Sequence, residues 1–246
     1  MTAGGEDLYE QLHKHSWYYM EEKPEYTLAK PYLPKQGEIL EIGSGNAAFA
    51  KICGIERYTG LEFNDAAIAL AKSKNILLKK EPIETHSINN KLKYQCVVSF
   101  QVLEHIQNPA AFIQKCIEVL APGGMLIIAV PNHDGICGKA QNNLLDMPPH
   151  HISHWSEKTM AHIGQQFNLK TVSIETENIA PYHKEWATMI YHENKIRSFF
   201  RFKKTLLDFR LQSRAIAKIA RLITKISSPK LFENKGHAMI ACYLKK

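Results

Sequence analysis

The stretch Ile39-Leu40-Glu41-Ile42-Gly43-Ser44-Gly45-Asn46-Ala47-Ala48 decides the fold. Its first four residues are typical of a buried strand and lead directly into a G-x-G-x-x-A turn, in which glycines let the backbone approach a ligand closely. Such a turn is common to nucleotide-binding βαβ units, and glycine-rich turns also occur without a ligand. The turn alone therefore leaves the ligand open.

An acidic residue follows the glycine turn at the spacing typical of a ribose-binding carboxylate. Glu62 ends the next apolar run, seventeen positions after Gly45. At the end of a second strand, a carboxylate can accept hydrogen bonds from ribose hydroxyls. The turn and the acid together predict a site for a nucleoside-containing cofactor.

Short apolar runs alternate with helical patterns over residues 37–130, which is typical of βαβ units that feed a parallel sheet. A helix is predicted over Pro109–Leu120, with Asn108 as its cap. The predicted strands are Glu38–Ile42, Tyr58–Glu62, Ile76–Lys79, Cys96–Phe100, Met125–Val130, Leu169–Glu177 and His237–Leu244.

Two later segments complete an ordered set of motifs: Ser99-Phe100-Gln101-Val102-Leu103-Glu104-His105-Ile106, and Leu120-Ala121-Pro122-Gly123-Gly124-Met125-Leu126-Ile127-Ile128. With them, residues 37–132 resemble the class I S-adenosylmethionine-dependent methyltransferases, in particular small-molecule enzymes related to the ubiquinone-pathway O-methyltransferases. The resemblance implies an α/β fold with a Rossmann-like doubly wound sheet, mostly parallel with an antiparallel last strand. It also implies S-adenosyl-L-methionine as the cofactor.

The resemblance assigns cofactor contacts to Glu41, Gly43, Ser44, Gly45, Glu62, Phe63, Glu81, Pro82, Ile83, Gln101 and Val102. Residues 41–45 would face the methionine end and Glu62 the ribose. Phe63 would cover the adenine, residues 81–83 would line its edge, and residues 101–102 would lie beneath the sulfonium. Two departures stand out: Ala47 replaces the usual third glycine, and Gln101 replaces an acid that helps some relatives to hold magnesium. We therefore predict no metal.

The loop after the fifth strand carries Pro148-Pro149-His150-His151 and resembles a stretch found in a subset of these enzymes. Because ligands bind beyond the carboxyl ends of parallel strands, this loop should line the active site. Transfer of a methyl group to a hydroxyl requires removal of a proton, and imidazole has a suitable pKa. His150 and His151 are therefore candidate catalytic bases, and His105, after the fourth strand, is a third.

Other interpretations of these histidines stay open. They could only fix the loop through hydrogen bonds, with Ser156 capping a helix that begins at Glu157. A metal site of His150, His151 and His154 lacks the i, i+4 spacing of common zinc motifs.

The positive charge is concentrated in one segment. The chain has a net charge of +7, yet between Lys195 and Lys230 eleven lysines and arginines stand against a single acid, Asp208. On a helical wheel, one face gathers the basic residues Arg214, Lys218, Arg221 and Lys225, and the opposite side gathers Ile216, Ile219, Ile223 and Ile226.

Three roles for this segment stay open. Its apolar stripe could pack on the catalytic body, residues 195–230 could contact an anionic membrane surface, or the segment could bind a phosphorylated, glycosylated or lipid-linked acceptor. Nucleic acid is not expected, because the Asn/Asp-Pro-Pro-aromatic motif after the fourth strand and the Pro-Cys nucleophile of several base methyltransferases are absent.

These observations predict three parts: an N-terminal helical cap (1–36) containing Trp17-Tyr18-Tyr19-Met20, a methyltransferase domain (37–182 and 236–246), and a basic amphipathic helical insertion (183–235).

Five scattered cysteines without C-x-x-C spacing and the lack of a long apolar run indicate a cytoplasmic protein, peripheral to the inner membrane face if the insertion binds lipid.

The expected function is S-adenosylmethionine-dependent methyl transfer to a small-molecule or glycan-like acceptor, at a hydroxyl oxygen. The alternatives are an NAD(P)-dependent oxidoreductase, which shares the turn and the ribose acid, and a cofactor-binding relative without catalysis.

Overall fold

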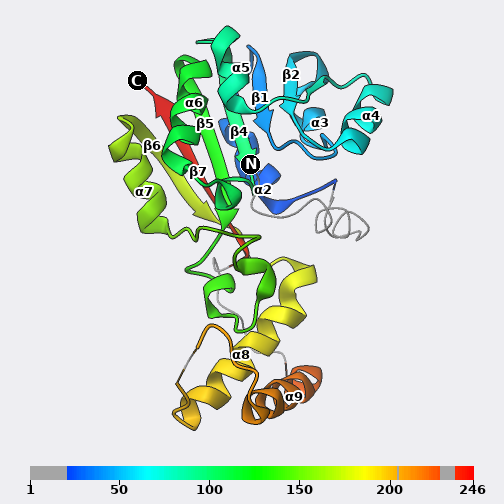
Figure 1. The fold of residues 1–246 in the computed structure, drawn as a ribbon, viewed down its shortest axis with the longest axis vertical. Helices are drawn as coiled ribbons and strands as arrows, with labels where there is room; N and C mark the ends of the chain where they lie inside the picture. The colour runs from blue at the N-terminus through cyan, green and yellow to red at the C-terminus, as the bar shows by residue number, and fades with distance from the viewer. Residues whose placement is uncertain (1–20, 204, 228–235) are drawn as a thin grey trace.

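A seven-stranded sheet forms the centre of the protein in a computed structural model that describes residues 21–203, 205–227 and 236–246 (Figure 1). The strand order is β3-β2-β1-β4-β5-β7-β6. The strands are β1 (Ile39–Ile42), β2 (Tyr58–Leu61), β3 (Leu78–Lys79), β4 (Tyr94–Phe100), β5 (Leu120–Pro131), β6 (Leu169–Thr176) and β7 (Ala238–Lys245).

The sheet is parallel from β3 to β5, and β7 runs antiparallel between β5 and β6. In the register, Ile42 at the end of β1 lies opposite Leu61 of β2 and Ser99 of β4. The carboxyl ends of β1, β2 and β4 therefore meet at one edge. This architecture confirms the predicted Rossmann-like fold, mostly parallel with an antiparallel last strand.

Helices cover both faces of the sheet. The α-helices are α2 (Pro24–Ala29), α3 (Ala50–Cys53), α4 (Asp65–Ser73), α5 (Ile83–Asn89), α6 (Pro109–Val119), α7 (Glu157–Gln166), α8 (Lys184–Phe199) and α9 (Leu211–Ile226). Short 3-10 turns are η1 (Lys30–Tyr32), η2 (Ile55–Arg57), η3 (Leu103–His105), η4 (Cys137–Lys139), η5 (Leu144–Asp146) and η6 (Pro181–His183).

Side chains that alternate along each strand build two separate cores. Leu40 and Ile42 face a core that includes residues of α5, α6 and α7, whereas Ile39 faces a core that includes residues of α2, α3 and α4. A strand covered on both faces reads as a continuous apolar run, which is why β1, β4 and β5 could be found in the sequence.

The expected elements are found with two notable differences at their ends. Helix α6 has the predicted Asn108 cap, whose side chain accepts the N–H of Ala111. Strand β3 keeps only two of its four predicted residues, because it lies at the sheet edge and pairs with β2 alone. Strand β5 begins at Leu120 rather than Met125, since Leu120 already lies opposite Tyr94 of β4.

Helices α8 and α9 pack on each other beyond one end of the sheet (Figure 1). The helical wheel grouped Ile216, Ile219, Ile223 and Ile226 on one side; of these, Ile216 is buried, Ile223 is half-buried, and Ile219 and Ile226 are exposed. Helix α9 packs against α8, and this contact covers only one narrow face of α9. The rest of its apolar side therefore stays exposed to solvent. Among the described residues, no helix is long and apolar enough to cross a membrane.

Within the predicted N-terminal cap, α2 and η1 are described, whereas the aromatic cluster Trp17-Tyr18-Tyr19-Met20 lies outside the described residues. The bounds proposed for the three parts stay a prediction.

Candidate active site

The glycine turn after β1 is held against the end of β2. Gly43 and Gly45 take left-handed backbone conformations, with φ of +72° and +50°. The N–H groups of Gly43 and Ser44 both donate to the carbonyl oxygen of Leu61, at 2.9 and 3.1 Å. A Cβ on Gly43 would lie 2.4 Å from Cγ2 of Val102, so the turn packs directly on the segment that follows β4. Only glycine meets both demands.

Ala47, which stands where the related methyltransferases usually have a third glycine, also adopts a left-handed conformation. Ala47 has a φ of +56° and is fully buried. A non-glycine residue in this region costs roughly 1–2 kcal/mol. The replacement of glycine by alanine therefore leaves the shape of the turn unchanged and adds backbone strain. The helix that follows, α3, is only four residues long.

Glu62 joins the ends of β1 and β2. Its Oε2 accepts the N–H of Gly45 at 2.7 Å, and its Oε1 accepts the N–H groups of Phe63 and Asn64 at 2.8 and 2.9 Å. A carboxylate offers about four acceptor positions, so acceptor capacity remains for a ligand hydroxyl. Beside it, the aromatic ring of Phe63 is 55% exposed, which suits a side chain that covers a planar ligand.

The predicted adenine edge lies between β3 and α5. Glu81 accepts a hydrogen bond from Nδ1 of His86 at 2.7 Å, and Pro82 is exposed directly before the helix. The side chain of Ile83 is buried in the core. At this edge, Ile83 could therefore offer a ligand its backbone rather than its side chain.

Three acidic side chains around the ends of β1 and β4 are buried. Glu25, Glu41 and Glu104 are each at most 5% exposed, and Lys23 is a positive charge that acts on all three. Burial raises the pKa of Glu41 to about 8, and the hydrogen bond donated by the Tyr58 hydroxyl opposes that shift. A bound cation would favour the ionised carboxylates, so the acids present fit a positively charged ligand. S-adenosylmethionine, with its sulfonium and ammonium groups, is such a ligand.

Gln101 and Val102 lie where the sequence placed them, at the end of β4 and beside the glycine turn. Gln101 has a φ of +56°, and its N–H donates to the carbonyl oxygen of Ala129 at 2.9 Å. Its buried side-chain amide interacts with the carboxyl of Glu25 and acts to lower the pKa of that group. A strained backbone at a non-glycine residue is typical of functional positions.

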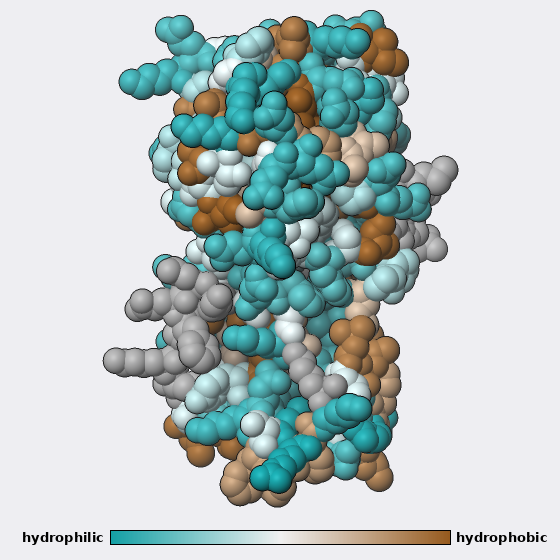
Figure 2. Space-filling model, turned by 90° about the vertical axis from the view of Figure 1, so that its left-hand side faces the viewer, coloured by the Kyte–Doolittle hydropathy of each residue, from teal (hydrophilic) through white to brown (hydrophobic). Residues whose placement is uncertain are grey.

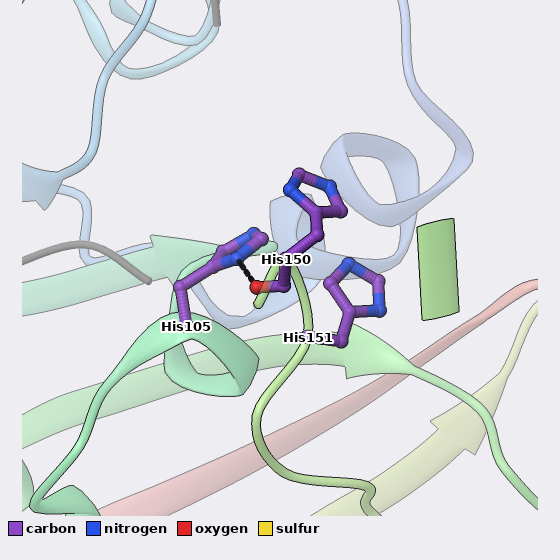
Figure 3. Close-up of side chains that lie close together, drawn as sticks. All are labelled: His105, His150 and His151. Atoms are coloured by element: carbon purple, nitrogen blue, oxygen red, sulfur yellow. Dashed lines mark hydrogen bonds between the residues drawn. The ribbon is translucent and has the colours of Figure 1, made fainter. Parts of the chain in front are cut away.

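The three candidate catalytic histidines meet in one cluster, with His105 on η3 and His150 and His151 on the loop after β5 (Figure 3). Their ring centroids are 4.7–4.9 Å apart. Nδ1 of His105 donates to the carbonyl oxygen of His150 at 2.6 Å. The N–H groups of Ile152 and Ser153 donate to the carbonyl oxygen of Glu104, at 3.0 and 3.2 Å. These bonds fasten the loop to the end of β4.

His151 is the histidine that a carboxylate orients. Its Nδ1 lies 2.9 Å from Oδ1 of the buried Asp146, while its Nε2 lies 4.0 Å from Oε1 of Glu104. Because a carboxylate only accepts hydrogen bonds, Nδ1 carries the hydrogen and Nε2 of the neutral ring is left as the proton acceptor. This arrangement is the one that catalytic dyads use to prepare a histidine base.

Burial shifts the pKa values of the other groups in the cluster. Burial lowers the pKa of both His105 and His150 to about 4, so both rings are neutral at neutral pH. The pKa of Glu104 is raised to about 8, mainly by burial and in smaller part by the nearby charges of Asp146 and Glu25. Glu104 is therefore largely a neutral carboxylic acid, and neither of its oxygens has a hydrogen-bond partner among the described residues.

Some site residues escaped the sequence analysis. Glu25, on α2, and Asp146, on η5, were not assigned roles, and Glu104 was named only as a neighbour of His105. The sequence signal for Asp146 was its place in the same loop as His151, five positions away. No sequence pattern pointed to Glu25, which lies outside the glycine motif and reaches the site only through the fold.

The histidines could also hold a metal ion. Ligand atoms of His105, His150 and His151 lie within 4.8 Å of one another, as do those of His133, Asp146 and His154. A metal-bound imidazole commonly donates its second nitrogen to a carboxylate, as His151 does to Asp146. The geometry alone therefore permits either proton transfer or metal binding, and the predicted absence of a metal stays a prediction.

Comparison with known sequences identifies related proteins. A family model described as a methyltransferase domain matches residues 12–174. A probable S-adenosylmethionine-dependent methyltransferase of Mycolicibacterium smegmatis is 29% identical over 104 residues, which cover 39% of this chain and 38% of that protein. A ubiquinone biosynthesis O-methyltransferase of Serratia proteamaculans is 26% identical over 104 residues, covering 39% and 43%. The chain spans less than half the length of these relatives.

Solved structures share the fold. A S-adenosylmethionine-dependent methyltransferase from Archaeoglobus fulgidus superposes with a TM-score of 0.62 at 16% identity, covering 96% of this chain and 100% of that one. A coclaurine N-methyltransferase bound to N-methylheliamine and S-adenosylhomocysteine gives a TM-score of 0.57 at 13% identity, covering 89% and 71%.

Proposed function

Because the chain belongs to the methyltransferase-domain family, whose relatives are class I S-adenosylmethionine-dependent enzymes, we propose that it transfers a methyl group from S-adenosylmethionine to a hydroxyl oxygen. The acceptor is a small molecule or a glycan-like compound. The family match makes the predicted resemblance secure and disfavours the nicotinamide alternative, which shares only the turn and the ribose acid.

The residues at the ends of β1, β2 and β4 hold the cofactor in this proposal. The Gly43-Ser44-Gly45 turn and Glu41 bind its methionine end, and Glu62 accepts hydrogen bonds from the ribose hydroxyls. Phe63 covers the adenine, whose edge residues 81–83 line. Gln101 and Val102 lie beneath the sulfonium.

When bound, S-adenosylmethionine supplies a methyl group on a positively charged sulfur, so its transfer to a hydroxyl oxygen releases one proton. His151 accepts that proton at Nε2, and Asp146 stabilises the resulting imidazolium. The Glu104 carboxyl, 4.0 Å from this nitrogen, is placed to hydrogen-bond the acceptor. His105 and His150 keep the loop in place and remain uncharged.

The observation that carries the proposal is the Asp146–His151 pair beside the cofactor edge. The segment after β4 connects the two: Val102 packs on the Gly43 turn, and Glu104, two residues later, lies against His151. A base oriented by a carboxylate within this short distance along the chain suits a hydroxyl acceptor, which must lose a proton. An amine acceptor that is already neutral would place less demand on it.

The test is methyl transfer to panels of hydroxyl and amine acceptors, including glycans and lipid-linked glycans, detected by mass spectrometry. We expect products from hydroxyl acceptors, and turnover by His151→Gln reduced roughly 10²–10⁴-fold with cofactor affinity retained. His162→Gln, an exposed histidine on α7, is the matched control and should behave as the unaltered chain. Amine-only products would overturn the hydroxyl assignment, and cofactor binding without any product would favour a non-catalytic relative.

A lipid-linked acceptor is favoured by one specific observation. A pocket of about 240 Å³ runs from Asp146 and Met147, next to the histidine cluster, to Thr205 and Leu206 of the loop between α8 and α9. An acceptor with a polar head and an apolar tail would fit a pocket that joins these two surroundings. In the acceptor panel, lipid-linked glycans should then be turned over faster than the same glycans without lipid.

A further inference from the structure

The tip of the α8–α9 pair exposes an unusual amount of apolar surface. Phe199 and Leu211 are 80% and 82% exposed, and Ile226 at the far end of α9 is 88% exposed. The other exposed members of this surface are Phe200, Leu206, Leu207, Phe209, Ile219 and Leu222. Figure 2 shows brown apolar side chains beside teal hydrophilic ones at the lower end of the molecule, which α8 and α9 form in Figure 1. Surfaces of this kind mark interaction sites.

Helix α9 has three distinct faces. Ser213, Ile216 and Ala220 are buried on the face that packs on α8. At 100° per residue, a second, exposed face carries Leu211, Ala215, Ile219, Leu222 and Ile226. A third, exposed face about 90° from the apolar one carries Arg214, Lys218, Arg221 and Lys225. The apolar and basic stripes thus run side by side along the length of the helix.

Hydrogen bonds hold the loop between α8 and α9 in shape. The carboxylate of Asp208 accepts from Arg210 at 2.8 and 2.9 Å and from Arg197 at 3.4 Å. Asn142 binds the backbone N–H and carbonyl of Asp208, at 2.8 and 3.0 Å. The exposed side chains of Leu206, Leu207 and Phe209, which neighbour Asp208 in the chain, are therefore presented by a fixed backbone.

The charge of this surface selects the partner. Asp208 is the single acid between Lys195 and Lys230, and two arginines already neutralise it. The remaining charges of this segment are all basic, and they call for an anionic partner. Nucleic acid would satisfy the charge but leave the apolar stripe in water, whereas an anionic lipid bilayer satisfies both stripes of an amphipathic helix lying in its surface.

We propose that the exposed apolar and basic stripes of α9, together with the apolar tip of the α8–α9 loop, dock the protein on an anionic lipid bilayer surface. The helix lies in the plane of the bilayer, with the apolar stripe among the lipid chains and the basic stripe at the headgroups. Leu206 belongs both to this surface and to the pocket that reaches Asp146. This inference rests on the proposed function with a lipid-linked acceptor. Docking would then place the mouth of the pocket at the bilayer surface, from which such an acceptor enters.

The test uses the full chain and flotation with two kinds of vesicle, phosphatidylcholine alone and phosphatidylcholine mixed with phosphatidylglycerol. We expect binding to the mixed vesicles and little to phosphatidylcholine. Replacing Arg214, Lys218 and Arg221 by glutamine should weaken binding on the order of 100-fold, since each charge near an anionic surface contributes about fivefold. Leu211→Ser with Leu222→Ser and Ile226→Ser should weaken it at least tenfold, even at low salt.

Controls keep the outcomes distinct. Lys158→Gln with Lys170→Gln, exposed lysines on the catalytic body, should leave binding unchanged. Hydrogen exchange of residues 211–226 should slow when vesicles are added. Equal binding to both vesicle types, no binding to either, or tight binding to duplex RNA that outcompetes vesicles would each overturn the proposal. So would light scattering that shows a stable dimer dispersed by the serine variants.

The docking proposal and the proposed function can fail separately. Calorimetric titration with S-adenosylmethionine is repeated on every docking variant, and each should bind the cofactor as the unaltered chain does. Cofactor binding without vesicle binding would remove the docking proposal alone. Vesicle binding without cofactor binding would remove the proposed function alone.

Discussion

The cofactor edge and the histidine cluster adjoin each other, yet they are built in different ways. At the cofactor edge, backbone groups do most of the work: left-handed glycines, amide bonds to Leu61, and a carboxylate held by three N–H groups. In the histidine cluster, side chains set the geometry: Asp146 orients His151 of the same loop, and the ring of His105 donates to the backbone carbonyl of His150. We therefore expect the glycine turn and Glu62 to tolerate few backbone changes. Single side-chain changes in the histidine cluster should disable it without unfolding the protein.

The largest expected effect is on turnover, at Asp146. Asp146→Asn keeps the size of the side chain but removes the charge that orients His151 and stabilises its protonated form. We expect turnover to fall by roughly 10²–10⁴-fold, while the affinity for S-adenosylmethionine changes little. Steady-state kinetics at several pH values measure the effect, since a lost partner should also shift the pH profile.

Asp134→Asn is the matched control for this prediction. Asp134 lies on the same loop and is exposed, and its side chain accepts the backbone N–H of Glu157. A similar loss of turnover in both variants would mean that Asp146 acts through the loop as a whole, and the dyad would then be wrong.

The second effect is on stability, at Gly43. Gly43→Ala places a Cβ 2.4 Å from Val102 at a φ of +72°. Strain and overpacking together should lower the free energy of unfolding by roughly 2–5 kcal/mol and weaken cofactor binding. Gly123→Ala is an apt control, because Gly123 has a φ of +70° with open space around it.

Urea unfolding of the two glycine variants separates strain from the steric contact. Gly123→Ala should lose only the conformational part, about 1–2 kcal/mol. If Gly43→Ala proved no more destabilising than Gly123→Ala, the close packing of Val102 on the turn would be refuted.

A smaller effect is expected in the pH dependence of stability. A carboxyl whose pKa rises on folding binds its proton more tightly in the folded state, so its contribution to stability declines as the pH rises from about 4.5 to about 8. Glu104→Gln, which cannot ionise, should therefore raise the unfolding midpoint at pH 8 by the equivalent of about 1–3 kcal/mol. At pH 5 the gain should be much smaller, and a gain that is equal at both pH values would contradict a raised pKa of Glu104.

The smallest expected effect is that of metal removal. The proposed chemistry needs proton acceptance by His151 and no metal, so a chelator should leave turnover unchanged. Elemental analysis of the purified protein completes the measurement. Stoichiometric zinc or magnesium, with turnover lost on chelation and restored by the metal, would reassign the histidine cluster as a metal centre.

The sequence predicts the geometry at the ends of β1 and β2 well because local sequence patterns determine it. A continuous apolar run, two glycines and an acid at the end of the next strand are enough to place Gly43, Gly45 and Glu62. The register of β1 with β2 and β4 then brings them together. Strand β3 is predicted too long because an edge strand pairs on one side only, which a periodicity does not report.

The histidine cluster is only partly predictable for the opposite reason. The order of strands places the loop after β5 near the end of β4, so the meeting of His105 with His150 and His151 could be expected. Which histidine is oriented by an acid depends on the path of the loop, and that path has no pattern in the sequence. Asp146 therefore became visible only in the structure.

Helix α9 shows a further limit. A helical wheel divides its residues into basic and apolar sides, but it carries no information on which apolar residues another helix will cover. Packing on α8 buries Ile216 and leaves Ile219 and Ile226 exposed. The exposed apolar stripe thus follows from tertiary packing and not from the wheel.

Calorimetric titration of the protein with S-adenosylmethionine, S-adenosylhomocysteine and NAD(H) tests whether the site at the ends of β1 and β2 binds S-adenosylmethionine. A Glu62→Ala variant is run beside it, with Glu56→Ala, an exposed glutamate, as the control. The account predicts that both sulfur nucleosides bind, that NAD(H) does not, and that only Glu62→Ala weakens binding. Binding of NAD(H) alone, or of none of the three, would contradict the account.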